Sequence, residues 1–257
     1  MYKLLISDFY NTLVNDEEAI SFNTMLGIDN IRKSGKLFSI MTSEMSRKII
    51  EYNRDFPFID YVIGFNGNSI YDVEEEKEIY SKKLPTSIVV KLSKLYSNEN
   101  ICFYTFENCN FYGLNHPKDY AKEIEDIDEF IKENKNDIYK VTIYFNSKIY
   151  AEEELTNIKK LKANLDCYIE EIENKYVIEI TSSVSNKLIG LEKILKKEKI
   201  KLSEVAAIAS TENAKKLCKD VGLSFYIERD YILKNNKEKI NINNNNNAIE
   251  VILNNIN

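Results

Sequence analysis

The sequence predicts an α/β protein in which a doubly wound parallel sheet forms the core and a second α/β domain is inserted into that core. Three observations support this fold class. Short apolar strands alternate with amphipathic helices over the first 70 residues, the middle of the chain changes to an α+β pattern with antiparallel hairpins, and the alternation returns near residue 184. We therefore expect a core domain at 1–82 and 184–257 and an inserted domain at 83–183.

The N-terminal block has the order β-α-β-α-β, which implies a parallel sheet with right-handed crossovers. An apolar run makes 3–9 a buried strand, and a helix follows at 19–33 with Gly35 after its end. The next strand, helix and strand are expected at 36–42, 46–56 and 59–65, the helix being stopped by Pro57.

The remaining elements follow from the same periodicities. In the inserted domain, after a charged hairpin at 69–84, we expect helices at 86–96, 118–134 and 152–164 and strands at 101–106, 138–145, 166–171 and 175–181. In the C-terminal block we expect a helix at 188–200, a strand at 205–210, a helix at 213–221, a strand at 224–227 and a last helix behind an Asn-rich loop.

Composition excludes several classes of protein. The net charge of −6 leaves no broad basic surface, so we expect no nucleic-acid partner. No stretch approaches the roughly 18 consecutive apolar residues of a transmembrane helix, so we expect no membrane span. The four cysteines include no C-x-x-C pair and the N-terminus lacks the features of a signal peptide. These features predict reduced thiols in a cytoplasmic protein.

Polar side chains follow the strands that would meet at one edge of the core sheet. Asp8 ends the first strand, Thr42 and Ser43 follow the second, residues 210–213 follow a later strand, and Lys187 opens the helix before it. The carboxyl ends of parallel strands face one crevice in such a sheet. A carboxylate can attack phosphorus there, while hydroxyls, backbone N–H groups and a lysine hold the phosphate oxygens. The arrangement therefore suits phosphoryl chemistry.

Five segments in this order resemble the haloacid dehalogenase (HAD) superfamily of phosphohydrolases, and in particular its Cof-type branch. The segments are DFYNTL, FSIMTSEMSRKI, YVIGFNGNSIYD, EITSSVSNKLIGLEKIL and ASTENA. The resemblance covers nearly the whole chain and implies a HAD-like, Rossmannoid core with an inserted α/β cap domain. It also implies Mg²⁺-dependent hydrolysis of the phosphate monoesters of small metabolites through an aspartyl-phosphate. In this family the cap selects the substrate, so the motifs name neither a substrate nor an oligomeric state.

The resemblance assigns roles to individual residues. Asp8 matches the nucleophile, which is also a Mg²⁺ ligand, and Lys187 matches the lysine that orders the nucleophile and the phosphate. Thr42 matches the phosphate-binding hydroxyl, with Ser43 beside it, and Asn213 matches the asparagine of the last motif.

Other positions depart from the family pattern. Tyr10 stands where the general acid/base aspartate is expected, and Ser210 and Ala214 stand where the last motif has aspartates that serve the metal. Mg²⁺ prefers oxygen ligands that include one or two carboxylates, and Asp8 is the only motif carboxylate left. The metal-site candidates are therefore Asp8 and Ser210, which can still offer its hydroxyl oxygen. Loss of a general acid/base typically costs about 10²–10⁴ in rate. We therefore expect a hydrolase homologue with lost or much reduced activity; the alternative is a non-catalytic descendant that binds a phosphorylated ligand or a protein.

Three further features of the sequence each have two interpretations. Asn66 and Gly67 form either a simple tight turn or part of the substrate pocket. For His116, the only histidine, the first interpretation is a loop residue and the second is a metal ligand, because no second metal-ligating side chain accompanies it. For the aromatic segment 103–113, the first interpretation is packing in the core and in a hairpin, and the second is contact with the substrate.

Overall fold

The computed structural model describes residues 2–256 except 11, 15–18, 56, 115–120, 162, 173, 185, 212–214, 216, 229–230, 236 and 242–247, with backbone alone at 52–55 and 254–255. The chain divides into two compact units. We call Met1–Tyr80 with Asn186–Asn257 the core unit and Ser81–Ser185 the cap unit. Within the described residues, no helix has both the length and the apolar character needed to cross a bilayer.

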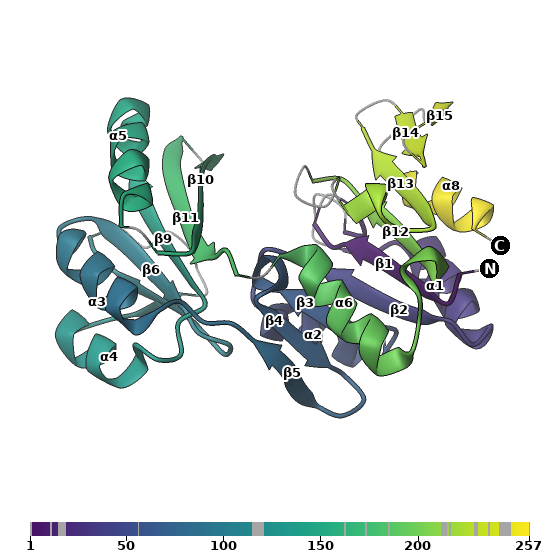
Figure 1. Ribbon diagram of the computed structural model, residues 1–257, viewed down its shortest axis with the longest axis horizontal. Helices are drawn as coiled ribbons and strands as arrows, with labels where there is room; N and C mark the ends of the chain where they lie inside the picture. Colours follow the sequence, from purple (N-terminus) through teal and green to yellow (C-terminus); the bar gives the residue numbers. More distant parts are fainter. Residues whose placement is uncertain are drawn as a thin grey trace. The chain divides into compact units, whose positions relative to one another are not determined.

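The described part of the core unit contains one mixed sheet of nine strands (Figure 1). In spatial order the strands are β15 (Glu238–Asn241), β14 (Tyr231–Lys234), β13 (Leu223–Ile227), β12 (Val205–Ala209), β1 (Leu4–Asp8), β2 (Leu37–Met41), β3 (Tyr61–Gly64), β4 (Ser69–Asp72) and β5 (Lys77–Ser81). The five central strands, from β13 to β3, pair in parallel. β4 is antiparallel to β3, and β14 is antiparallel to β13.

Helices cover both faces of this sheet, because successive side chains of a strand point to opposite faces. Leu5 of β1 packs in a cluster with apolar residues of α1 (Phe22–Lys33), α2 (Ser46–Asp55) and α8 (Ala248–Asn255). Leu4 and Ile6 pack in a second cluster with apolar residues of α6 (Lys187–Glu198). β1 is buried along its whole length. Asp8, the last residue of β1, is thereby held at the carboxyl edge of a rigid strand.

The described part of the cap unit is a six-stranded sheet with helices on one face (Figure 1). In spatial order the strands are β10 (Leu165–Ile172), β11 (Lys175–Ser182), β9 (Lys140–Phe145), β6 (Asn100–Tyr104), β7 (Cys109–Tyr112) and β8 (Lys122–Glu123). The helices are α3 (Thr86–Leu95), α4 (Ile127–Asn134) and α5 (Lys148–Lys159), and their apolar residues share one core with the sheet. The aromatic segment 103–113 includes the β6–β7 hairpin, and Phe103 lies in this core.

The predicted fold class is confirmed, and several elements differ from expectation. The helix expected at 118–134 begins at Ile127, because the side chain of Asp126 accepts hydrogen bonds from the N–H groups of Asp128 and Glu129 and caps it there. The helix expected at 152–164 spans Lys148–Lys159 and starts after the cap Ser147. Strands β14 and β15 were not predicted, because β15 is polar and largely exposed and the apolar run of β14 is only three residues long, too short to indicate a strand by itself.

Candidate active site at the carboxyl ends of the core strands

The Asp8 carboxylate lies at the end of β1 and is 2% exposed. Its Oδ1 accepts a hydrogen bond from Lys187 Nζ at 2.7 Å. Its Oδ2 accepts three more, from Ser210 N at 3.0 Å, Thr211 N at 3.1 Å and Thr211 Oγ1 at 2.9 Å. A buried carboxylate is stable only when its charge is paired and its lone pairs accept hydrogen bonds, and Asp8 meets both conditions with groups of this chain.

Lys187 supplies the positive charge of the site from the first turn of α6. The side chain of Asn186 caps this helix by accepting a hydrogen bond from Ile189 N. A cation at a helix N-terminus is opposed by the helix dipole. Lys187 is nevertheless 5% exposed, and its ion pair with Asp8 offsets that repulsion. Its ammonium group also lies 3.4 Å from Thr211 Oγ1.

The loop after β3 packs against the start of α6 and fixes the position of Lys187. Phe65, Asn66 and Gly67 all have positive φ angles, of 48°, 54° and 100°. A Cβ atom on Gly67 would lie 2.1 Å from the carbonyl oxygen of Asn186, so only glycine fits at this contact. Asn66 and Gly67 are both buried. The structure therefore shows that this turn is in close contact with Asn186, the residue that precedes Lys187.

Thr42 lies directly after β2 and is 4% exposed. Its hydroxyl oxygen accepts a hydrogen bond from Glu44 N at 3.1 Å, and its carbonyl oxygen accepts one from Asn66 N at 3.0 Å. Ser43, between Thr42 and Glu44, is half-buried. These bonds hold the β2 end and the loop after β3 together, so Thr42 is held in a fixed position at the same edge of the sheet as Asp8.

The first motif and the loop after β12 are also joined directly. Thr12 Oγ1 donates a hydrogen bond to Ser210 Oγ at 2.8 Å. Ser210 therefore serves the site twice, because its hydroxyl accepts from Thr12 and its N–H donates to Asp8. The structure thus brings Asp8, Lys187 and Ser210 into one hydrogen-bonded cluster that also includes Thr211, to which the sequence analysis assigned no role. The signal that could have found Thr211 is its hydroxyl two residues after the end of β12, a strand that pairs in parallel with β1.

Comparison with known proteins agrees with this geometry. The family model described as haloacid dehalogenase-like hydrolase matches residues 5–253. The chain belongs to this family. A curated relative is the 5-amino-6-(5-phospho-D-ribitylamino)uracil phosphatase YitU of Bacillus subtilis (strain 168), which is 25% identical over 209 residues, or 74% of this chain and 73% of the relative. The predicted membership of the HAD superfamily and its Cof-type branch is therefore confirmed.

Solved structures of HAD proteins have the same fold. TM0651 from Thermotoga maritima superposes with a TM-score of 0.77 at 16% identity, over 100% of this chain and 98% of that one. A haloacid dehalogenase-like hydrolase from Bacteroides thetaiotaomicron gives a TM-score of 0.77 at 17% identity, with 100% of both chains covered. These likenesses establish the fold, whereas the chemistry of this HAD chain depends on its own residues.

Tyr10, at the position of the HAD acid/base, is engaged in packing. Its ring contacts the ring of Phe9 edge to face, with centroids 5.0 Å apart. The ammonium group of Lys48, on α2, lies 5.3 Å from the centre of the Tyr10 ring. Tyr10 is half-buried against the α1/α2 side of the core. The structure thus shows an aromatic side chain anchored between Phe9 and α2 where the family motif has a small acid.

HAD phosphatases generally use Mg²⁺, but the described residues of this chain do not fit that ion. Mg²⁺ needs oxygen lone pairs in near-octahedral geometry, usually with one or two carboxylates. Every described group bonded to the Asp8 carboxylate is a hydrogen-bond donor, and none of them is a second carboxylate that could share a metal ion with it. In the part of the chain that the structure describes, no group of three His, Cys, Asp or Glu side chains could hold a metal ion.

Three residues discussed for the sequence, Asn213, Ala214 and His116, lie outside the described residues. A further neighbour of Asp8 is Cys218, which is buried in the short helix that follows the loop after β12. Burial raises the pKa of the Cys218 thiol to about 12, and the negative charge of Asp8 adds to the rise. The thiol is therefore protonated at neutral pH and adds no second anion to the site.

Proposed function

We propose that this chain binds a small phosphorylated metabolite at the site formed by Asp8, Thr42 and Lys187, and that its Mg²⁺-dependent hydrolysis of phosphate monoesters is lost or much reduced. Family membership supports the ligand class, since a curated relative is a phosphatase of a phosphorylated compound. The reduced activity is supported by one observation above all: both oxygens of the Asp8 carboxylate are occupied by donors of this chain.

The remaining hydrogen-bonding capacity of the site suits a phosphate group. The Thr42 hydroxyl accepts its hydrogen bond from Glu44, so its own proton can be donated to a phosphate oxygen. The Lys187 ammonium has three N–H donors, of which two are directed to Asp8 and Thr211. The third can be donated to the same phosphate. Asn213 matches the corresponding family motif and is proposed to contribute to phosphate binding.

The same contacts explain why attack on phosphorus would be slow. A nucleophilic carboxylate attacks with a lone pair, and the four hydrogen bonds to Asp8 stabilise its resting form and so lower its nucleophilicity. Tyr10 is a poor substitute for the missing acid/base, because a phenol is a far weaker acid than a carboxylic acid and holds its proton too tightly to act as a base at neutral pH. Together these two changes weaken the nucleophile and the proton transfer on which family members depend.

The test is phosphate release from a panel of sugar phosphates, nucleotides and p-nitrophenyl phosphate, with Mg²⁺ present. We expect the natural protein to release no more phosphate than Asp8→Asn. The triple variant Tyr10→Asp, Ser210→Asp, Ala214→Asp restores the acids of the family motifs and is the control for the assay. Release by the natural protein well above that of Asp8→Asn would contradict the proposal and show a working hydrolase.

Binding is measured separately, by calorimetric titration of the same phosphate esters without metal. We expect saturable binding that weakens about tenfold or more in Thr42→Val, because one charge-assisted hydrogen bond to phosphate is lost. Absence of binding to every ester would contradict the ligand class and favour a descendant that binds a protein partner. We also propose that the protein works in the cytoplasm, and its four free, buried cysteines support a reducing compartment.

A further inference from the structure

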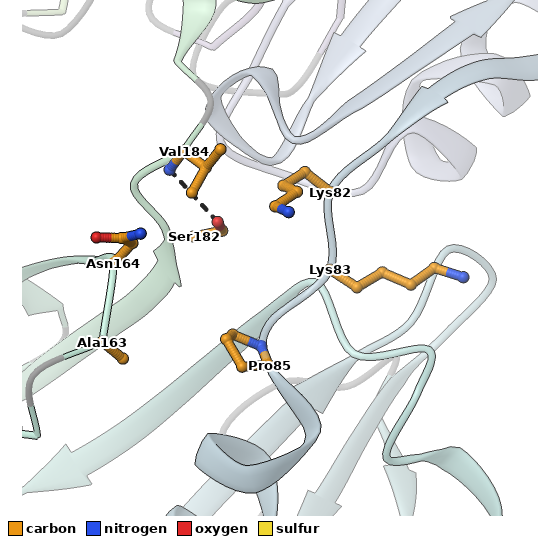
Figure 2. Close-up of a pocket in the computed structure, with 7 residues that line it drawn as sticks. All are labelled: Lys82, Lys83, Pro85, Ala163, Asn164, Ser182 and Val184. Atoms are coloured by element: carbon orange, nitrogen blue, oxygen red, sulfur yellow. Dashed lines mark hydrogen bonds between the residues drawn. The ribbon is translucent and has the colours of Figure 1, made fainter.

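The cap unit contains a cavity of about 420 Å³ at the segments through which the chain enters and leaves it (Figure 2). The cavity is lined by Lys82, Lys83, Pro85, Ala163, Asn164, Ser182 and Val184. These residues come from the segment before α3, the turn between α5 and β10, and the end of β11. A volume of this size falls within the roughly 300–1,000 Å³ of small-molecule sites. No acidic side chain is among the lining residues.

The two lysines at the cavity differ in their partners. Lys83 Nζ forms a salt bridge with Asp137 Oδ1 at 2.7 Å and lies 5.6 Å from the centre of the Tyr139 ring. Lys82 forms no hydrogen bond or salt bridge with any residue that the structure describes, although it is half-buried. Figure 2 shows the Lys82 side chain directed toward Ser182 and Val184, whereas that of Lys83 extends away from them. Among the residues that the structure describes, Lys82 is therefore a positive charge at the cavity without a counter-charge.

The start of α3 adds a second attraction for an anion. Pro85 lines the cavity and immediately precedes this ten-residue helix, and no side chain caps the helix start. The Pro85 carbonyl oxygen accepts hydrogen bonds from Ile88 N and Val89 N, so the N–H groups of Thr86 and Ser87 are left without a described partner. Unsatisfied N–H groups at a helix N-terminus carry partial positive charge and bind anions.

The rest of the cavity wall consists of apolar side chains and of neutral groups that can donate hydrogen bonds. Pro85, Ala163 and Val184 present hydrocarbon surface, and Val184 is 44% exposed. Asn164 adds a side-chain amide whose NH₂ group can donate. We propose that this cavity is a binding site for a small organic anion, which places a phosphate or carboxylate group at Lys82 and the start of α3 and an apolar portion against Val184. The proposal goes beyond the function proposed above, because no lining residue belongs to the Asp8 site.

The experiment titrates phenyl phosphate, benzoate and inorganic phosphate into the full-length protein and follows the backbone amide resonances by NMR. We expect phenyl phosphate or benzoate to shift the amides of Lys83, Thr86, Asn164 and Val184. The comparison of these two probes shows whether the site prefers phosphate or carboxylate. Weaker binding of inorganic phosphate than of phenyl phosphate is expected, because inorganic phosphate leaves the apolar wall uncovered.

Lys82→Ala and Lys83→Ala form a matched pair of variants. We expect Lys82→Ala to weaken binding about tenfold or more and Lys83→Ala to leave it within about twofold, since Lys83 is paired with Asp137 and Lys82 has no partner among the described residues. Val184→Asp, which places a negative charge in the wall, should also abolish binding. Equal effects of the two lysine variants would overturn the proposal. Ligand-induced shifts confined to Thr42, Asn66 and Lys187 would overturn it as well, because the ligand would then occupy the Asp8 site alone.

Discussion

The core unit and the cap unit each contain a buried lysine–carboxylate pair, and the two pairs are built differently. In the core unit, Asp8 and Lys187 are 2% and 5% exposed and 2.7 Å apart. In the cap unit, Lys140 and Glu179 are 0% and 6% exposed and 3.1 Å apart. Burial and charge are thus alike, so neither distinguishes a functional site from a structural one.

The surroundings of the two pairs do distinguish them. Lys140 and Glu179 lie within neighbouring strands, where Glu179 Oε2 accepts a hydrogen bond from the Tyr168 hydroxyl and Lys140 Nζ lies 4.4 Å from the centre of the Tyr104 ring. The Asp8 pair lies at a strand end, and its other partners are backbone and hydroxyl groups of the loop after β12. Loop groups at a sheet edge can be reached by a ligand, whereas a pair within the strands only holds the sheet together.

The largest expected effect is at the cap pair. Lys140→Met leaves the Glu179 carboxylate buried without its counter-ion, and we expect the free energy of unfolding to fall by about 3–5 kcal/mol. Urea denaturation measures this value. The double variant Lys140→Met, Glu179→Leu removes both charges and should recover much of the loss. A single variant as stable as the natural protein would show that water reaches the pair and that the comparison with Asp8 is invalid.

The next effect is at the Asp8 pair. Asp8→Asn removes the charge that compensates buried Lys187, and we expect a loss of about 2–4 kcal/mol in the free energy of unfolding. The same urea titration measures it, with Asp29→Asn on exposed α1 as the control for an aspartate change at a surface salt bridge. An Asp8→Asn protein that is more stable than the natural protein would mean that the carboxylate is held under strain for catalysis. It would contradict the interpretation that the charge and hydrogen-bond acceptors of Asp8 are fully compensated.

A smaller effect is expected at Thr211. Thr211→Val keeps the backbone hydrogen bond to Asp8 but removes the hydroxyl donor, which should cost about 1 kcal/mol in stability. Thr211→Ser retains the hydroxyl and is the matched control. If the valine and serine variants unfold at the same urea concentration, the hydroxyl does not help to hold Asp8 in place.

The smallest effect concerns an exposed pair, Glu75 with Lys197, which lies 2.7 Å apart. Hydrogen bonds from Lys197 and Lys77 lower the pKa of Glu75 from 4.5 to about 2. A carboxylate with a lowered pKa in the folded state stabilises the protein above its unfolded pKa. This contribution is lost as the pH falls from about 4.5 to about 2.

The measurement compares the melting temperature of Glu75→Gln with that of the natural protein over this pH range. We expect a difference of a few degrees at most near pH 6 that shrinks as the pH falls, because exposed ion pairs contribute little. A difference that grows toward low pH would contradict the assigned pKa direction.

The sequence was sufficient to predict the elements whose signal is local. The apolar run before Asp8 predicted β1, and the apolar periodicity after Lys187 predicted α6, because a buried strand and an amphipathic helix each leave a pattern in their own residues. Motif order then predicted the family. The local signal failed where polar residues form the edge strand β15, where the apolar run of β14 is very short, and where capping by Asp126 set the start of α4.

By itself, the sequence determined the fold class, the family and the set of polar residues at the carboxyl ends of the core strands. It also showed that Tyr10 and Ser210 had replaced acids. Only the tertiary structure decided which groups donate hydrogen bonds to the Asp8 carboxylate. Its partners Lys187 and Thr211 lie 179 and 203 residues further along the chain, and no local pattern reports hydrogen bonds over that separation. A buried charge must be compensated by whatever groups the fold brings within about 3 Å, and that choice is made by packing.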